Sequence, residues 1–286
     1  MARVPYRVRV DIFIGELLTS IVYNCNVTIA GMVCQLDKPR SRSLTLTGMM
    51  NILKSAAFVL FVIAFPLLLV STNVRLTVND ERLYEHGFNK YDISEETGIP
   101  DDDLMKAAGH LVRYFNGSEA SPQVEVSRGG QQIDLFTERE MLHLRDVKTI
   151  VQMFYWVQWI TLGYVIAYIG AILIMHRRTG LQRIARGLIY ACAATLGCLA
   201  ILGIWALIDF DSLFRVFHYA SFRNDLWLLD PSSDYLIMMF PEGFFFDAAL
   251  LLVGGTVAEI LMFAVGSWIY LRGKRKRAEP SVGTNP

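Results

Sequence analysis

The stretch that decides the fold is IVQMFYWVQWITLGYVIAYIGAILIM, residues 150–175, which contains no charged side chain. At about 1.5 Å of rise per residue, a helix of this length crosses the roughly 30 Å hydrocarbon core of a membrane. Its first ten residues include Phe154, Tyr155, Trp156 and Trp159, and such aromatic clusters favour the membrane–water interface. The stretch therefore predicts a transmembrane helix that begins at an interface.

Three further apolar runs have the same character, at residues 55–74, 187–208 and 246–271. The whole chain of 286 residues is 53% hydrophobic and only 19% charged, which is too apolar for an ordinary soluble domain. The 27 basic residues equal the 27 acidic ones, which excludes a strongly basic nucleic-acid-binding protein. We therefore predict an α-helical membrane protein with four transmembrane helices.

The charges between these helices alternate in sign. Basic residues precede the first span, lie between the second and third, and follow the fourth. Residues 75–148 instead hold nine Lys and Arg against fifteen Asp and Glu, and residues 209–246 hold two against six. By the positive-inside rule, both acidic segments are extracytoplasmic and both termini are cytoplasmic, in a multi-pass protein of the cell membrane.

The predicted organisation has nine segments. They are an N-terminal extension (1–48), four transmembrane helices (49–74, 149–175, 187–208 and 246–271), a small extracytoplasmic α+β segment (75–148), a basic cytoplasmic loop (176–186), an aromatic-rich extracytoplasmic loop (209–245) and a basic cytoplasmic tail (272–286). Within the extension, residues 12–34 fit an interfacial amphipathic helix, a fifth span, or a stretch upstream of the true start at Met49 or Met50.

The first extracytoplasmic segment contains helix and hairpin signals. Asn79 or Asp80 is a suitable cap for a short helix, and we expect Gly87 to end it. A second helix is expected to begin after Pro100, and Gly129-Gly130 between two alternating runs predicts a β-hairpin. These signals together predict the α+β character of residues 75–148.

The end of that segment reads LFTEREMLHLRDVK, residues 135–148. Thr137 and Glu140 form the pattern of a capping box, so a helix should start here and continue into the second span. Glu140, His143 and Asp146 then share roughly one face. His143 lies about seven residues, or about 11 Å, outside the hydrocarbon, which is roughly the depth of the lipid headgroups and close to the layer of ester bonds.

The second extracytoplasmic loop reads FHYASFRNDLWLLDP over residues 217–231. Its content of aromatic and Leu residues is high for a loop, which indicates contact with lipid or with a hydrophobic cleft. His218 follows the third span by about ten residues, so it can reach the same layer as His143.

Both blocks resemble a family of bacterial integral membrane proteins that includes the lipoprotein intramolecular transacylase. The resemblance covers about residues 50–272 and rests on Leu-Phe-x-x-Arg-Glu-x-x-His-x-x-Asp-Val-Lys and on the later Phe-His block with its downstream Trp. It implies acyl transfer at the outer leaflet, from a glycerol ester to the α-amine of the N-terminal cysteine of the same lipoprotein. His143 and His218 match the functional histidines of the family, with Glu140 and Asp146 as supporting residues.

The resemblance implies membrane lipids and diacylglyceryl lipoproteins as partners. We expect no metal, no cofactor and no nucleic acid. One histidine would act as general base and the other as a donor to the oxyanion, in an order that the sequence leaves open. Asp146 either orients His143 or pairs with Lys148 or Arg145. His86, His110 and His176 are expected to be structural or solvated.

Two alternatives remain open from the residues alone. Glu140, His143, Asp146 and His218 could bind a divalent metal in a membrane hydrolase. Glu259 is an acid near the middle of the fourth span, where a charged carboxylate costs free energy. It could indicate a transport or scaffold protein instead. The sequence offers no specific partner for Glu259, and it leaves the oligomeric state undetermined.

Overall fold

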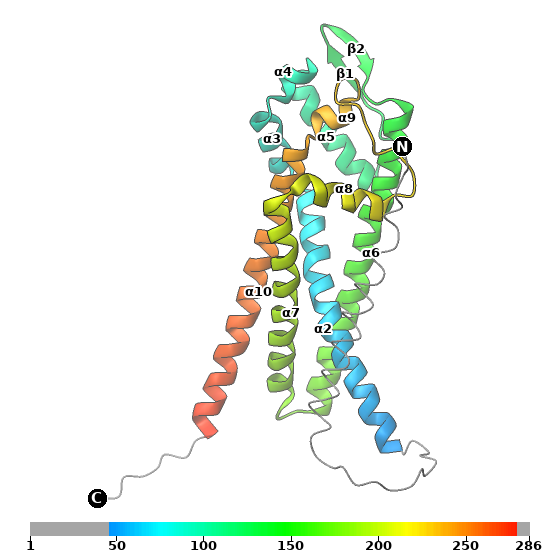
Figure 1. The fold of residues 1–286 in the computed structure, drawn as a ribbon. Helices are drawn as coiled ribbons and strands as arrows, with labels where there is room; N and C mark the ends of the chain where they lie inside the picture. Colours follow the sequence, from blue (N-terminus) through cyan, green and yellow to red (C-terminus); the bar gives the residue numbers. More distant parts are fainter. Residues whose placement is uncertain (1–45, 279–286) are drawn as a thin grey trace, which may run out of the picture. The chain divides into compact units, whose positions relative to one another are not determined.

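The structure is a computed structural model that describes residues 46–278. Four long helices dominate it: α2 (Leu46–Val78), α6 (Glu138–Met175), α7 (Gly180–Ile208) and α10 (Glu242–Ala278) (Figure 1). Each is long and apolar enough to cross a membrane, which confirms the predicted set of four candidate spans. The stretch at residues 12–34 lies outside the described residues.

Helices α6 and α10 are longer than a membrane requires. They contain 38 and 37 residues, or about 55 Å at 1.5 Å per residue, against a hydrocarbon thickness of about 30 Å. Their ends therefore extend beyond the apolar layer without a break. This continuity connects the polar residues at the start of α6 rigidly to the span that follows them.

Within the apolar layer, aromatic rings of α2 pack against small residues of α7. Phe61 is completely buried and stacks on Tyr168 of α6 with ring centroids 4.6 Å apart. A Cβ atom at Gly187 of α7 would lie 3.1 Å from the Phe61 ring, so the glycine permits this close approach. Ala191 and Cys192, one turn further along α7, are buried in the same cluster.

The segment between α2 and α6 forms three helices and a hairpin. These are α3 (Glu81–Lys90), α4 (Ile93–Thr97), α5 (Asp101–Phe115), β1 (Glu125–Arg128) and β2 (Gln131–Asp134). The strands are antiparallel, with Val126 opposite Ile133, and both turn glycines have positive φ. The expectation that Gly87 ends α3 is wrong. The helix continues to Lys90, and Gly87 is buried against the ring of Phe244 from α10, where a Cβ atom would clash.

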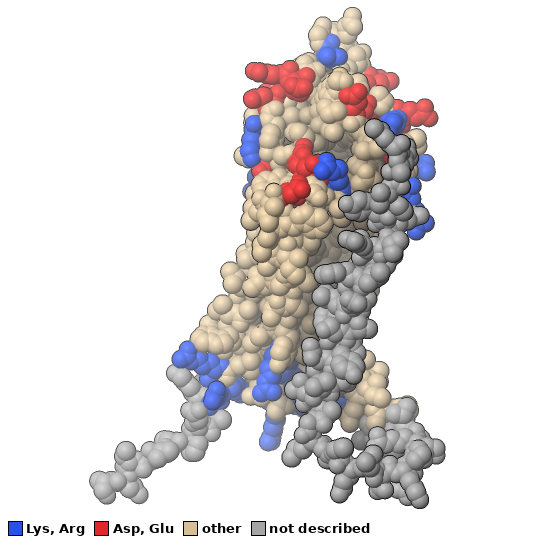
Figure 2. Space-filling view, viewed as in Figure 1, with Lys and Arg blue, Asp and Glu red and all other residues tan. Residues whose placement is uncertain are grey.

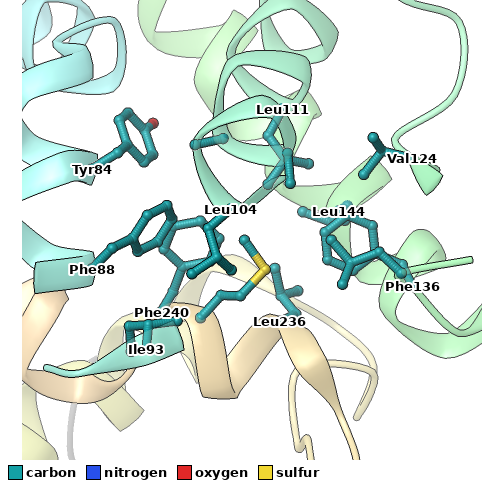
Figure 3. Packing of buried hydrophobic residues seen from close by; sticks show 14 of the residues in the cluster. Tyr84, Phe88, Ile93, Leu104, Leu111, Val124, Phe136, Leu144, Leu236 and Phe240 are labelled. Atoms are coloured by element: carbon teal, nitrogen blue, oxygen red, sulfur yellow. The ribbon is translucent and has the colours of Figure 1, made fainter. Parts of the chain in front are cut away.

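The two segments outside the apolar spans share one hydrophobic core (Figure 3). Leu104 and Leu111 of α5 and Phe88 of α3 pack with Leu236 and Phe240, which come from the loop between α7 and α10. That loop contains the short helix α9 (Tyr235–Met239), whose Met239 is fully buried in the same cluster. The second loop is therefore folded into the first segment.

Helix α8 (Phe210–Ser221) connects α7 to this shared core. Asp209 separates it from α7 and caps it by accepting a hydrogen bond from the backbone N–H of Ser212. In Figure 1, α8 runs across the ends of the long helices rather than parallel to them. This change of direction carries His218, near the end of α8, towards the start of α6.

Candidate active site

The structure brings His143 and His218 together from separate parts of the chain. His143 lies in the second turn of α6, and His218 lies in the last turn of α8. Their ring centroids are 6.2 Å apart, and the ring planes differ by 30°. Both side chains are buried, with 7% and 8% of their surface exposed. Two imidazoles thus share one desolvated site next to the membrane-spanning bundle.

Glu140 fixes the start of α6 and, with it, His143. One carboxylate oxygen of Glu140 accepts hydrogen bonds from the backbone N–H of Thr137 at 2.7 Å and from the Thr137 hydroxyl at 2.8 Å. The other oxygen accepts from the backbone N–H of Leu236 in α9, also at 2.7 Å. The predicted capping box is present. The hydrogen bond from Leu236 adds a long-range contact to it. Glu140 is completely buried, so these hydrogen bonds replace its lost hydration.

His218 is surrounded by aromatic rings. Its ring centroid lies 4.3 Å from that of Phe214, 4.9 Å from that of Trp227 and 5.6 Å from that of Phe222. His218 Nδ1 is 2.7 Å from the backbone carbonyl oxygen of Phe214. Because a carbonyl can only accept, Nδ1 carries the proton and donates it. In the neutral ring, Nε2 then holds the free lone pair.

The electrostatics of the site favour uncharged imidazoles. Desolvation lowers the pKa of His218 below its usual value, although the hydrogen bond to the Phe214 carbonyl opposes this shift. At a centroid separation of 6.2 Å, protonation of both rings would also place two like charges close together in a medium of low polarity. His143 differs from His218 because its buried Nδ1 has no hydrogen-bond partner among the described residues.

The loop after α8 is tied to α6 by two polar contacts. The side-chain amide of Asn224 donates to a carboxylate oxygen of Asp146 at 2.8 Å, and Arg139 donates to the backbone carbonyl of Asp225 at 2.6 Å. Of the two alternatives for Asp146, the pairing with Lys148 or Arg145 is not formed, since its hydrogen-bond partner is Asn224. Asp146 therefore holds the loop that encloses His218.

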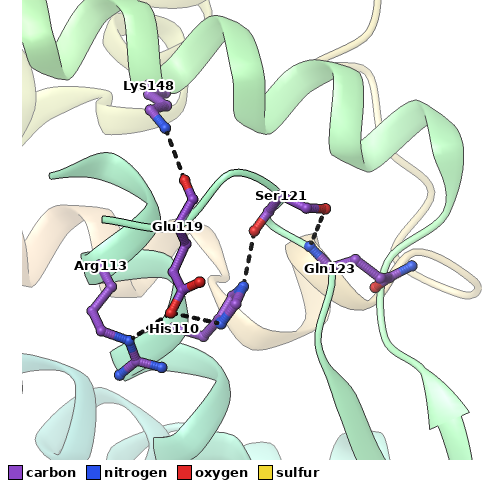
Figure 4. A network of polar contacts seen from close by, with 6 residues as sticks. All are labelled: His110, Arg113, Glu119, Ser121, Gln123 and Lys148. Atoms are coloured by element: carbon purple, nitrogen blue, oxygen red, sulfur yellow. Dashed lines mark hydrogen bonds and ion pairs between the residues drawn. The ribbon is translucent and has the colours of Figure 1, made fainter. Parts of the chain in front are cut away.

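Lys148 belongs to a different polar network, shown in Figure 4. Its ammonium group donates to the backbone carbonyl of Glu119 and lies 3.9 Å from the centroid of the Tyr114 ring. In the same network, His110 donates to the backbone carbonyl of Ser121 at 2.9 Å. These contacts hold the connection between α5 and β1 in place. The contact that His110 makes is therefore a structural one.

Glu259 has a partner that sequence reasoning missed. The side-chain amide of Asn73 in α2 donates to a carboxylate oxygen of Glu259 in α10 at 2.8 Å. A Cβ atom at Gly255, one turn away in α10, would clash with the same Asn73 side chain. The signal for this pair was an amide near the C-terminal end of an otherwise apolar run. Glu259 thus joins two spanning helices.

Other site residues could have been found from helix periodicity. Phe214 lies four residues before His218, so a helical reading of residues 210–221 places its carbonyl beside the imidazole. Trp227 and Asn224 carry no comparable local signal, because their positions depend on the path of the loop. Within residues 46–278, no group of three or more His, Cys, Asp and Glu side chains is arranged to hold a metal ion.

Comparison with known proteins identifies the family of this chain. Residues 59–245 match the family model described as lipoprotein intramolecular transacylase Lit. The chain belongs to the Lit family. A relative described as an uncharacterized protein from Aquifex aeolicus is 23% identical over 215 residues, which are 75% of this chain and 91% of the relative.

Solved Lit structures have the same fold. The Lit protein of Bacillus cereus superimposes with a TM-score of 0.63 at 19% identity, covering 81% of this chain and all of that one. A variant of the same protein with one histidine replaced by alanine gives a TM-score of 0.60 at 19% identity, over 82% of this chain and all of the variant. The Lit fold therefore extends over most of the chain.

Replacing Glu140 by Ala should destabilise this Lit-family protein. The change leaves the buried N–H group of Leu236 without an acceptor, at about 1–3 kcal/mol, and removes the capping interaction with Thr137, at about 1 kcal/mol. We expect the free energy of unfolding to fall by roughly 3 kcal/mol, measured by thermal unfolding of the purified protein. Glu138→Ala is the matched control, because Glu138 is exposed on the same helix. Equal losses in both variants would contradict the anchoring role of Glu140.

Proposed function

We propose that this protein moves an acyl chain from a glycerol ester of a diacylglyceryl lipoprotein to the α-amine of its own N-terminal cysteine. The observation that carries the proposal is the pair of buried imidazoles, His143 and His218, with ring centroids 6.2 Å apart. Membership of the Lit family supports the same reaction class. Membrane lipids and lipoproteins are then the partners.

The proposed site lies at the outer leaflet. Basic residues gather at the end of the bundle that holds the α6–α7 turn, and acidic residues gather at the other end (Figure 2). By the positive-inside rule, this polarity favours cytoplasmic termini and an extracytoplasmic segment 75–148. His143 precedes the apolar stretch of α6 by about seven residues, or about 11 Å, which favours the depth of the glycerol esters.

The reaction needs two proton-handling groups and no protein nucleophile. The amine nitrogen attacks the ester carbonyl carbon, so an N–C bond forms and the C–O bond to glycerol breaks. His218 accepts the amine proton at Nε2 and then delivers it to the departing glycerol oxygen, because its Nδ1 is already committed to the Phe214 carbonyl. His143 donates an N–H to the carbonyl oxygen as negative charge develops there.

The aromatic rings around His218 suit such a substrate. Phe214, Phe222 and Trp227 present apolar surface to acyl chains and exclude water from the reacting atoms. Amine and ester belong to one molecule, so their high effective concentration replaces a covalent enzyme intermediate. The carboxylate of Glu140 is engaged with Thr137 and Leu236, and no observation on the described residues favours the metal-hydrolase or transport alternatives.

His143→Ala and His218→Ala should each abolish the product while the protein remains folded in the membrane. General acid–base and oxyanion groups each contribute about 10²- to 10³-fold or more to the rate. Because the transfer is intramolecular, substrate and product have equal mass. The readout is therefore tandem mass spectrometry of the lipoprotein N-terminal peptide, combined with loss of labelling at its α-amine.

His86→Ala is the matched control for both variants, because His86 is exposed on α3 and lies outside the site. It should retain the activity of the unchanged protein. Full activity in either site variant would overturn the proposal. A product that has lost one acyl chain as free fatty acid would identify a hydrolase instead.

Asparagine substitutions should separate the two roles. An Asn side chain supplies an N–H donor but no basic nitrogen. His143→Asn should therefore be more active than His143→Ala, by about tenfold or more within the 10²- to 10³-fold contribution of an oxyanion donor. His218→Asn should be as inactive as His218→Ala in the same single-turnover assay. The reverse pattern would exchange the two assignments.

The rate should fall as the pH is lowered. Protonation of the substrate amine, with a pKa of about 7.7–8.0, removes the attacking lone pair. Burial keeps the pKa of His218 below its usual 6.5, so its protonation is a second loss at lower pH. A plot of log rate against pH should have a slope near one below about pH 8 and a steeper slope below pH 6.5. Initial rates that rise on acidification would contradict a neutral His218 base.

A further inference from the structure

A groove lies between α7 and α10 at the basic end of the helix bundle. Its volume is about 290 Å³, and it is far from the histidine site because it lies near the opposite ends of these helices. Leu181 and Leu188 of α7 line one wall, and Met262 and Phe263 of α10 line the other. These walls are apolar and suit hydrocarbon.

Two hydroxyl groups interrupt the apolar lining. Ser267 lines the groove, is only 7% exposed, and makes no hydrogen bond with any other described residue. Tyr270, one turn nearer the basic end, also lines the groove. By contrast, the buried hydroxyls of Thr195 and Thr256 in the same two helices donate to backbone carbonyls four residues earlier. The hydroxyl of Ser267 is therefore available to a ligand that enters the groove.

Two basic residues follow the groove lining in sequence towards the basic end of the bundle. Lys274 follows Tyr270 by four residues and therefore lies on the same face of α10, while Arg178 precedes Leu181 by three residues in the turn before α7. Both side chains are exposed. The basic end of the bundle carries Lys and Arg with no acidic residue visible beside them in Figure 2.

We propose that this groove binds an anionic glycerophospholipid of the monolayer at the basic end of the bundle. Along α10 the order is Lys274, then the hydroxyls of Tyr270 and Ser267, then the apolar Phe263. A phospholipid has the same order of phosphate, ester oxygens and acyl chains. Basic pockets between transmembrane helices bind such head groups, and the bound lipid supplies the acceptor that Ser267 lacks.

The test compares lipid binding to the full-length purified protein by native mass spectrometry. Phosphatidylglycerol and phosphatidylcholine of identical chains are titrated separately. The double variant Arg178→Gln/Lys274→Gln should weaken phosphatidylglycerol binding by about twentyfold, since each cation contributes about fivefold. Ser267→Leu should also expel the lipid, because it fills the groove without changing the charge.

The control is Arg186→Gln/Arg272→Gln, which removes the same charge from the same end. These residues lie two positions from Ile184 and Tyr270, or about 200° around their helices, away from the groove. The control should keep most of the phosphatidylglycerol affinity. Equal losses in the two double variants, unchanged affinity in Ser267→Leu, or equally tight binding of phosphatidylcholine would each overturn the proposal. Circular dichroism checks that every variant retains its helix content.

Discussion

The buried carboxylate of Glu140 is the constraint on which the rest of the site depends. It closes the cap of α6 through Thr137 and at the same time accepts the N–H of Leu236, a residue 96 positions later in the chain. Leu236 belongs to the core shared by the two segments outside the spans. One side chain therefore couples the start of the helix that carries His143 to the loop that follows His218. A buried acid of this kind is tolerated only because each oxygen accepts at least one hydrogen bond.

The parts of the fold that the sequence predicts are those with local causes. Hydropathy identifies the four spans, and the spacing of Thr137 and Glu140 identifies the start of α6. Gly87 shows where local signals fail, because a glycine that ends a helix and one that admits a neighbouring ring look alike in a single sequence. Here the glycine admits Phe244, a residue of α10. The helix therefore continues past it to Lys90.

The candidate site was predictable in its two histidines but not in its connections. His143 and His218 stand in recognisable blocks, whereas the partners of Asp146 and Glu259 depend on how distant segments meet. Asn224 is 78 residues from Asp146, and Asn73 is 186 residues from Glu259. Periodicity describes one helix at a time, so it cannot identify hydrogen bonds between elements whose relative position is set by tertiary packing.

The two imidazoles are similarly buried but differ in their hydrogen bonds, and this difference suits the two rings to different roles. The Nδ1 proton of His218 is fixed by the Phe214 carbonyl within its own helix, so the orientation of that ring does not depend on substrate. His143 has a buried nitrogen without a partner among the described residues, which costs free energy until an incoming group satisfies it. A group that gains a hydrogen bond only when charge develops nearby stabilises the transition state more than the ground state. The unequal bonding of the two rings therefore suits them to different roles, one as a proton acceptor and the other as a hydrogen-bond donor.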